Sequence, residues 1–148
     1  MINFENLKRA EKINSKDREV NRMITIEIKT RKRNEILDIT TDIEKFLEGN
    51  GVVLIFTPHT TASIILNEAE SRLLEDILSF LEKIAPYNSY YKHNEIDDNA
   101  DAHLKASLLG NSVVLPFENG KLQLGTWQRI LFLEFDGPRT RKVFLKVI

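Results

Sequence analysis

The sequence contains no cysteine among its 148 residues. This excludes disulfides, thiol nucleophiles and thiolate zinc sites, so a bound metal would take histidine, carboxylate or amide ligands. A surplus of charge is also missing, because 21 basic and 22 acidic side chains leave a formal net charge of -1. We therefore expect neither nucleic acid nor a membrane as a partner. Residues 1–20 contain no long apolar run, which argues against a signal peptide or membrane anchor and favours a cytoplasmic protein.

Internal repeats, low-complexity tracts, a Gly-x-Ser-x-Gly motif and a phosphate-binding glycine loop are absent from the sequence as well. The length fits one domain with a full hydrophobic core. Residues 1–22 are mostly charged and polar, and we interpret them as an N-terminal extension. Residues 23–148 are then predicted to form a single domain.

The hydrophobic pattern predicts an α+β fold, with a mainly antiparallel, sandwich-like set of strands and two or three helices. Strands are expected at 23–30, 52–56, 62–66, 112–117, 121–125, 127–135 and 141–148. Helices are expected from near Thr41 to Gly49, from 70 to 84 and from 99 to 109. We expect the strand at 52–56 to be buried on both faces, because it is continuously apolar.

The expected helices carry capping signals. Thr41 and Glu44 have capping-box spacing, Asn67 and Glu70 have it again, and Asp98 or Asn99 is the expected cap of the helix at 99–109. Within the helix at 70–84, the apolar side chains recur at helical intervals and are predicted to be core: Leu73, Leu74, Ile77, Leu78, Leu81 and Ile84.

All three histidines lie in short polar clusters. His93 and His103 bracket an eleven-residue segment that also holds four carboxylates and two amides. Imidazoles and carboxylates bind divalent metals or move protons near neutral pH, so this segment is a candidate functional site. Asp98 and Asp101 have an alternative to a metal-binding or catalytic role, which is to stabilise the helix, because acids at a helix N-terminus complement its dipole.

The helix at 99–109 gives His103 a specific position. Steps of about 100° place it between two apolar stripes and near Ser107, while Asp101 and Lys105 share another side. We expect a half-buried imidazole with room beside it for a ligand. A core histidine bonded to one backbone carbonyl is the alternative.

His59 lies in the hydroxyl-rich turn at 57–61, at the end of a predicted strand, where loops commonly carry function. Three histidines on one divalent ion would leave an open position for water or substrate, as in catalytic metal sites. The expected cofactor is therefore a divalent metal, with zinc as one possibility. For Thr57, Thr60 and Thr61, simple hydrogen bonding within the turn is the alternative to a chemical role.

Several blocks of the sequence are distinctive. They are Tyr91-Lys92-His93, then Asp98-Asn99-Ala100-Asp101-Ala102-His103-Leu104-Lys105-Ala106-Ser107-Leu108-Leu109-Gly110, then Gly120-Lys121-Leu122-Gln123-Leu124-Gly125-Thr126-Trp127-Gln128, together with His59-Thr60-Thr61-Ala62, Asn67-Glu68 and Glu134-Phe135-Asp136-Gly137-Pro138-Arg139. From about residue 23 to the C-terminus, these blocks closely resemble the YjbQ-like family.

The resemblance implies an α+β sandwich-like homotrimer whose polar blocks meet in a cleft near the subunit boundary. It also implies a secondary thiamin-phosphate synthase activity, which joins a pyrimidine diphosphate to a thiazole phosphate and releases pyrophosphate. The implied roles are metal ligation by His59, His93 and His103, catalysis by Glu68, Asp98 and His103, and substrate binding by Thr60, Asn67, Asn99, Lys105, Trp127, Gln128 and Arg139.

The residues fit such chemistry, because a phosphorylated substrate needs cations near its oxygens, and Lys105 and Arg139 are among those available. Trp127 could stack on a heteroaromatic ring, although a lone tryptophan is more often a core or interface anchor. The leading hypothesis is therefore a metal-assisted transferase. A trimeric protein that binds a metal or small anion without turnover is the alternative, and purely structural trimerisation is a third.

Overall fold

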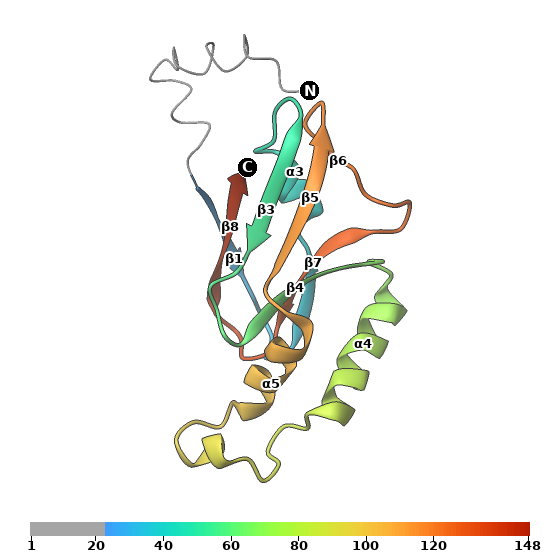
Figure 1. The fold of residues 1–148 in the computed structure, drawn as a ribbon. Helices are drawn as coiled ribbons and strands as arrows, with labels where there is room; N and C mark the ends of the chain where they lie inside the picture. The colour runs from blue at the N-terminus through green and yellow to red at the C-terminus, as the bar shows by residue number, and fades with distance from the viewer. Residues whose placement is uncertain (1–22) are drawn as a thin grey trace.

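The structure, a computed structural model, describes residues 23–148. In this part of the chain the strands and helices form three stacked layers (Figure 1). A five-stranded sheet packs on a three-stranded sheet, and two helices lie against the other face of the smaller sheet. The fold is therefore α+β and sandwich-like, as predicted. The extension expected at residues 1–22 lies outside the described residues.

The larger sheet has the order β1-β8-β3-β5-β6, and every neighbouring pair is antiparallel. Its strands are β1 (Ile24–Lys29), β3 (Gly51–Phe56), β5 (Ser112–Glu118), β6 (Lys121–Leu122) and β8 (Thr140–Val147). The smaller sheet has the order β2-β7-β4, also antiparallel, and consists of β2 (Glu35–Asp38), β4 (Ala62–Asn67) and β7 (Arg129–Glu134). The short strand β2 was not predicted.

The helices are α3 (Thr40–Glu44), α4 (Ser71–Ile84) and α5 (Ala100–Leu109), with a 3-10 turn η1 at Lys92–Glu95. Among residues 23–148, no helix is long and apolar enough to span a bilayer. Helices α4 and α5 cover the outer face of the smaller sheet and share a core cluster with it.

Strand β7 occupies the middle of the middle layer. Ile130 and Phe132 face the larger sheet, whereas Leu131 and Leu133 face the helices, because successive side chains of a strand point to opposite faces. This makes β7 the strand buried on both faces. The prediction of that role for β3 was wrong, since Val52 is exposed on the face of the larger sheet that nothing in residues 23–148 covers.

The predicted helix ends also differ from those observed. Helix α3 is shorter than expected, and the Asp38 side chain, rather than Thr41, accepts the hydrogen bond from its first turn. At α4 the capping acceptor is Glu70, which bonds the Leu73 amide, and not Asn67. Ile84, predicted to be core, is exposed, because α4 contacts the sheet along a narrow stripe centred on Leu81.

A buried ion pair joins the two sheets at one end. The carboxylate of Glu134 on β7 is fully buried and accepts hydrogen bonds from the guanidinium of Arg141 on β8. Thr30 also donates to it at 2.8 Å, and Arg141 donates at 2.7 Å to Thr61, directly before β4. Three regions that are distant in sequence, at Thr30, at Thr61 and at 134–141, are thus held together by one ion pair.

We expect the substitution Glu134→Gln to lower the free energy of unfolding by about 3 kcal/mol, because it leaves the Arg141 charge buried without its partner. Urea denaturation followed by circular dichroism measures this. Asp42→Asn, which breaks the exposed pair with Lys45, is the control and should cost less than about 1 kcal/mol. Equal losses in the two variants would contradict the role given to the buried pair.

Candidate functional site

The three histidines come from separate segments but lie around one helix. His59 belongs to the turn between β3 and β4, His93 to η1, and His103 to α5. His59 and His103 line one pocket of about 520 Å³, and His103 and His93 line a second of about 480 Å³. His103 is therefore shared by both pockets, half-buried as predicted. We call these three residues the histidine cluster.

A chain of polar contacts runs away from His93. Its Nε2 lies 3.0 Å from Oδ1 of Asn99, whose Nδ2 donates to Asp136 at 2.9 Å. Arg139 then donates to the same Asp136 oxygen at 3.0 Å. Asn99 is buried, and its side chain makes no capping bond to α5. The first amide of α5, that of Ala100, instead donates to the side chain of Asn94.

The ring of His103 lies next to that of His93. Their centroids are 4.9 Å apart and the rings are nearly perpendicular. Asp136 and Arg139 lie in the loop between β7 and β8, directly after the buried Glu134. The buried ion pair therefore fixes the loop that supports this side of the cluster.

His59 is held by the larger sheet. Its Nε2 accepts a hydrogen bond of 2.8 Å from the backbone amide of Lys142 on β8. Burial lowers the pKa of His59 below its usual value, and the positive charge of Arg141 lowers the pKa further, against an opposing effect of Glu134. The neutral imidazole is therefore favoured at this position.

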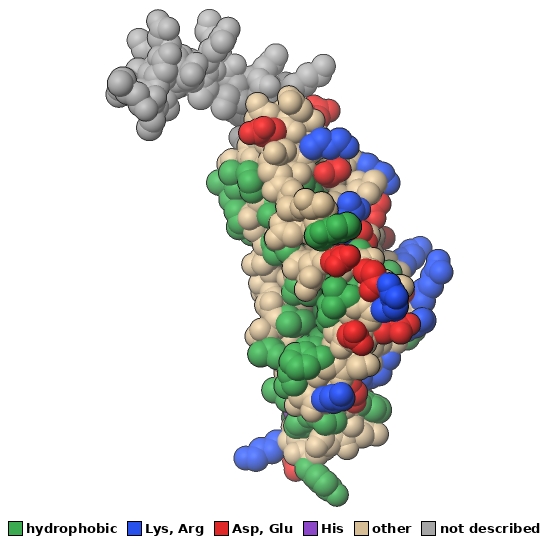
Figure 2. Space-filling model, turned by 90° about the vertical axis from the view of Figure 1, so that its right-hand side faces the viewer, with side chains coloured by type: hydrophobic (Ala, Val, Ile, Leu, Met, Phe, Trp, Pro, Cys, Tyr) green, Lys and Arg blue, Asp and Glu red, His purple; other side chains and the backbone are tan. Residues whose placement is uncertain are grey.

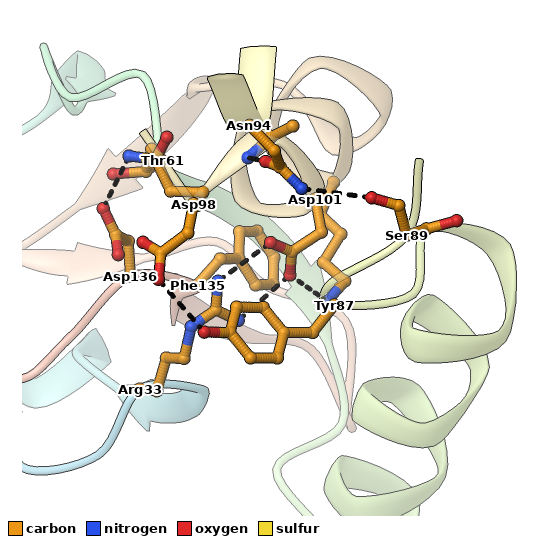
Figure 3. A network of polar contacts seen from close by, with 12 residues as sticks. Arg33, Thr61, Tyr87, Ser89, Asn94, Asp98, Asp101, Phe135 and Asp136 are labelled. Carbon is orange, nitrogen blue, oxygen red and sulfur yellow. Dashed lines mark hydrogen bonds and ion pairs between the residues drawn. The ribbon is translucent and has the colours of Figure 1, made fainter. Parts of the chain in front are cut away.

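Helix α5 is anchored by a second ionic network (Figure 3). Asp101 accepts hydrogen bonds from both Nη atoms of Arg33, at 2.8 and 3.0 Å, and from Nζ of Lys105 at 2.9 Å. Lys105 in turn donates to Glu82 of α4 at 2.7 Å, and the Arg33 guanidinium stacks 4.0 Å from the centre of the Tyr87 ring. We call this set of five residues the α5 anchor.

The α5 anchor changes the expected roles of two residues. Lys105, predicted to bind substrate phosphate, is only 3% exposed and is paired with Asp101 and Glu82. Asp101 is a partner in this network and not simply a charge at a helix N-terminus. Burial pushes the pKa of Asp101 up, but hydrogen bonds from Arg33 and Lys105 outweigh it, so its pKa lies below the usual value.

The side chain of Asp98 bonds a residue that is not part of the histidine cluster. Its carboxylate accepts a hydrogen bond of 3.2 Å from the Tyr87 hydroxyl, as Figure 3 shows, and it caps no helix. The role expected for it as a catalytic acid or base therefore has no support from its position.

Four of the expected site residues lie at the opposite end of the smaller sheet, and we call them the distal cluster: Asn67, Glu68, Trp127 and Gln128. Glu68 and Trp127 line one pocket there, beside the ion pair of Asp38 and Arg129. Strand β4 separates this end from His59, and at about 3.3 Å per residue its length corresponds to roughly 20 Å. Within one chain the predicted site is thus divided into two parts.

The histidine cluster fits a metal only in part. Within residues 23–148, no group of three histidine or carboxylate side chains is arranged to hold an ion. His93 and His103 are close enough to act as two ligands, and Asn99 supports His93 as an outer partner. His59 does not fit the role of a third metal ligand, because its Nε2 already accepts a hydrogen bond from the Lys142 amide.

Some residues that support the site have little or no signal in the sequence. Arg139 is expected as a phosphate-binding cation, but Asp136 has no signal beyond its place in the block at 134–139, and the supporting roles of Arg33, Glu134 and Arg141 are not predicted. Arg33 lies in the connection between β1 and β2, where a charged side chain is ordinarily solvated. Glu134 follows four apolar residues in β7, and a charge at the end of such a run is a usable signal of a buried ion pair.

This sandwich with a histidine-lined cleft has well-matched relatives. The model of a family described as UPF0047 protein YjbQ-like matches residues 24–148. A UPF0047 protein of Archaeoglobus fulgidus is 63% identical over 122 residues, which cover 82% of this chain and 97% of that protein. UPF0047 protein YugU of Bacillus subtilis is 43% identical over 129 residues, covering 84% and 97%. The chain therefore belongs to the YjbQ-like UPF0047 family.

Solved structures agree with this assignment. A hypothetical protein of Aeropyrum pernix is 44% identical, with a TM-score of 0.82 and coverage of 86% of this chain and 98% of that one. An uncharacterised protein of the same family from Clostridium acetobutylicum is 47% identical, with a TM-score of 0.79 and coverage of 84% and 99%. The fold and the family are thus established together.

For the α5 anchor, we expect Asp101→Asn to lower the free energy of unfolding by about 3 kcal/mol at pH 7, because Lys105 loses its buried partner. The depressed pKa of Asp101 means that its contribution is present above about 3.8, the unfolded value, and is lost as the pH falls through the folded pKa. Urea denaturation at pH 7 and near pH 3 should therefore show a difference from wild type that shrinks with acid. Asp97→Asn, at an exposed position, is the control; a pH-independent difference for Asp101→Asn would contradict this account.

Proposed function

We propose that the histidine cluster acts on a phosphorylated small molecule, and that the protein has a secondary thiamin-phosphate synthase activity. In that reaction a pyrimidine diphosphate loses pyrophosphate as its carbon bonds to the nitrogen of a thiazole phosphate. The observation that supports this proposal is the chain from His93 through Asn99 and Asp136 to Arg139, since its hydrogen bonds link the imidazole of one residue to the guanidinium of another. A cytoplasmic location stays a prediction.

Arg139 is the cation best suited to bind phosphate in this proposal. Its side chain is 53% exposed, and Asp136 orients it through hydrogen bonds to both the carboxylate and the backbone carbonyl. A guanidinium held in this way can donate to two phosphoryl oxygens and neutralise charge that develops on a leaving group. Lys92 is a second cation, since it is exposed and lines the pocket that His93 and His103 share.

His103 is the best candidate for proton transfer. It is half-buried, lines both pockets and contacts the ring of His93. An imidazole has two ring nitrogens, and a positioned one can donate or accept a proton in the transition state. Thr60 lines the same pocket as His59 and can hydrogen-bond a substrate there.

A divalent metal, with zinc as one possibility, would be held by His93 and His103 with further ligands from substrate or another subunit. Bound there, it would neutralise the negative charge of phosphate oxygens. Metal participation is part of the proposal, supported by the spacing of the two rings.

Homotrimer formation is also part of the proposal. Large apolar side chains are exposed one turn apart on α4, at Phe80 and Ile84, and on α5, at Leu104 and Leu108. Figure 2, which looks at the molecule from the side of α4, shows hydrophobic side chains reaching the surface between acidic and basic ones. Apolar surface of this kind favours subunit contact. Assembly would allow the distal cluster of one subunit to approach the histidine cluster of another.

A non-catalytic protein that binds a metal or small anion is the second candidate. It is favoured by the separation of the expected acid–base groups, because Glu68 lies in the distal cluster and Asp98 contacts Tyr87. In one chain, neither carboxylate is available beside the histidines. The two candidates differ in whether bound substrates turn over.

We expect purified protein, stripped of metal and reloaded with divalent ions, to form thiamin phosphate from the two substrates. His103→Ala should lower kcat/KM at least about a hundredfold, the usual scale for an acid–base group. Arg139→Gln should raise KM for the diphosphate about tenfold by removing phosphate contacts. Product is measured by chromatography, and Lys146→Gln, at an exposed position on β8, is the charge-matched control.

Product no greater than that of His103→Ala would refute the synthase proposal. If calorimetry still showed binding of the diphosphate, the non-catalytic candidate would be supported instead.

For the trimer, we expect light scattering to give the mass of three chains. Co-assembly of His103→Ala subunits with Glu68→Gln subunits should restore part of the activity, if the two clusters meet between subunits. A monomer in solution would contradict the assembly, and no recovery in mixed trimers would contradict the shared cleft.

A further inference from the structure

The nitrogen atoms of His59 and His93 have different hydrogen-bonding roles, fixed by their neighbours. A neutral imidazole has one N–H donor and one lone pair, so a partner that can only donate or only accept determines which nitrogen carries the proton. Both histidines have such a partner. That of His59 is a backbone amide, and that of His93 is the side-chain amide of Asn99, whose orientation a carboxylate determines.

For His59 the constraint is the backbone of β8. The regular pairing of β3 with β8 ends at Phe56 and Phe144. Beyond it, Lys142 still has both backbone groups satisfied by side chains, since its N–H donates to His59 Nε2 at 2.8 Å and its carbonyl accepts from Thr57 at 3.0 Å. The turn thus continues the sheet with side chains in place of backbone.

A backbone amide can only donate, so Nε2 of His59 holds the lone pair and Nδ1 holds the proton. Ligation of a metal through Nε2 would leave the Lys142 amide without its acceptor. Ligation through Nδ1 would place a proton on Nε2, opposite that same amide proton. Either mode breaks the bond, and an unsatisfied amide is costly.

For His93 the constraint begins at Asp136. This carboxylate accepts from Arg139, and so the Asn99 nitrogen donates to it while the Asn99 oxygen points to His93. Nε2 of His93 must then carry the proton, which leaves its Nδ1 lone pair available. Metal-binding histidines typically donate their other N–H to such an acceptor.

We propose that His59 is not a metal ligand but a fixed donor, through Nδ1–H, to an oxygen of the bound ligand, while His93 and His103 present lone pairs to a cation. Within residues 23–148, the His103 ring makes no hydrogen bond that would commit either nitrogen, whereas its backbone carbonyl accepts from Ser107. The assignment rests on the proposed function only in taking this cleft as the functional one. Under that function, the oxygen at His59 is a phosphoryl oxygen.

Long-range proton–nitrogen correlation spectra of the metal-free protein at pH 7.5 test the proton positions without any substitution. We expect His59 as the Nδ1–H tautomer and His93 as the Nε2–H tautomer. Observation of Nε2–H on His59, or of Nδ1–H on His93, would overturn the assignment.

Zinc titration by calorimetry tests the division of roles. His59→Asn should leave the zinc affinity within about threefold of wild type, whereas His93→Asn and His103→Asn should each weaken it at least a hundredfold. Circular dichroism establishes that each variant is folded. Loss of zinc binding in folded His59→Asn would overturn the proposal, as would a wild-type protein that binds no zinc. Because neither experiment measures turnover, a missing synthase activity would refute the proposed function and leave this assignment intact.

Discussion

The buried pair of Glu134 and Arg141 is the constraint on which the functional end of the molecule depends. A buried charge must be paired and hydrogen-bonded, and this carboxylate accepts hydrogen bonds from Thr30 directly after β1, from β8 and from the loop that follows β7. The same guanidinium reaches Thr61, two residues after His59. Both supports of the histidine cluster, the turn before β4 and the loop at Asp136, are therefore fixed from one point in the interior.

Much of the fold could be predicted because its information is local. Alternation and helical spacing indicated most strands and both long helices, and they placed His103 on a half-buried side of α5. The predictions were wrong where contacts between distant segments determine helix capping or strand burial. Cap spacing was misleading at Asn67, and β7 rather than β3 proved to be the doubly buried strand, because position in the layers and not apolar content alone sets burial.

The candidate site shows the same division between local and tertiary information. The histidines could be singled out from composition, but their pairing could not, since His59 is held by the backbone of Lys142 and His93 by a chain that ends at Arg139. Lys105 looked available for phosphate, and only the fold reveals that it neutralises Asp101. Residues that look similar in sequence thus have different roles: His59 is a hydrogen-bond donor, and His93 and His103 offer lone pairs. Lys105 and Asp101 belong to the α5 anchor.

A crystal structure of the protein with zinc and a phosphorylated substrate, with the ion located by anomalous scattering, tests the central claim most directly. The account predicts the ion on His93 and His103, with His59 still within hydrogen-bonding distance of the Lys142 amide and facing a substrate oxygen. An ion bound by His59, with that hydrogen bond broken, would contradict it.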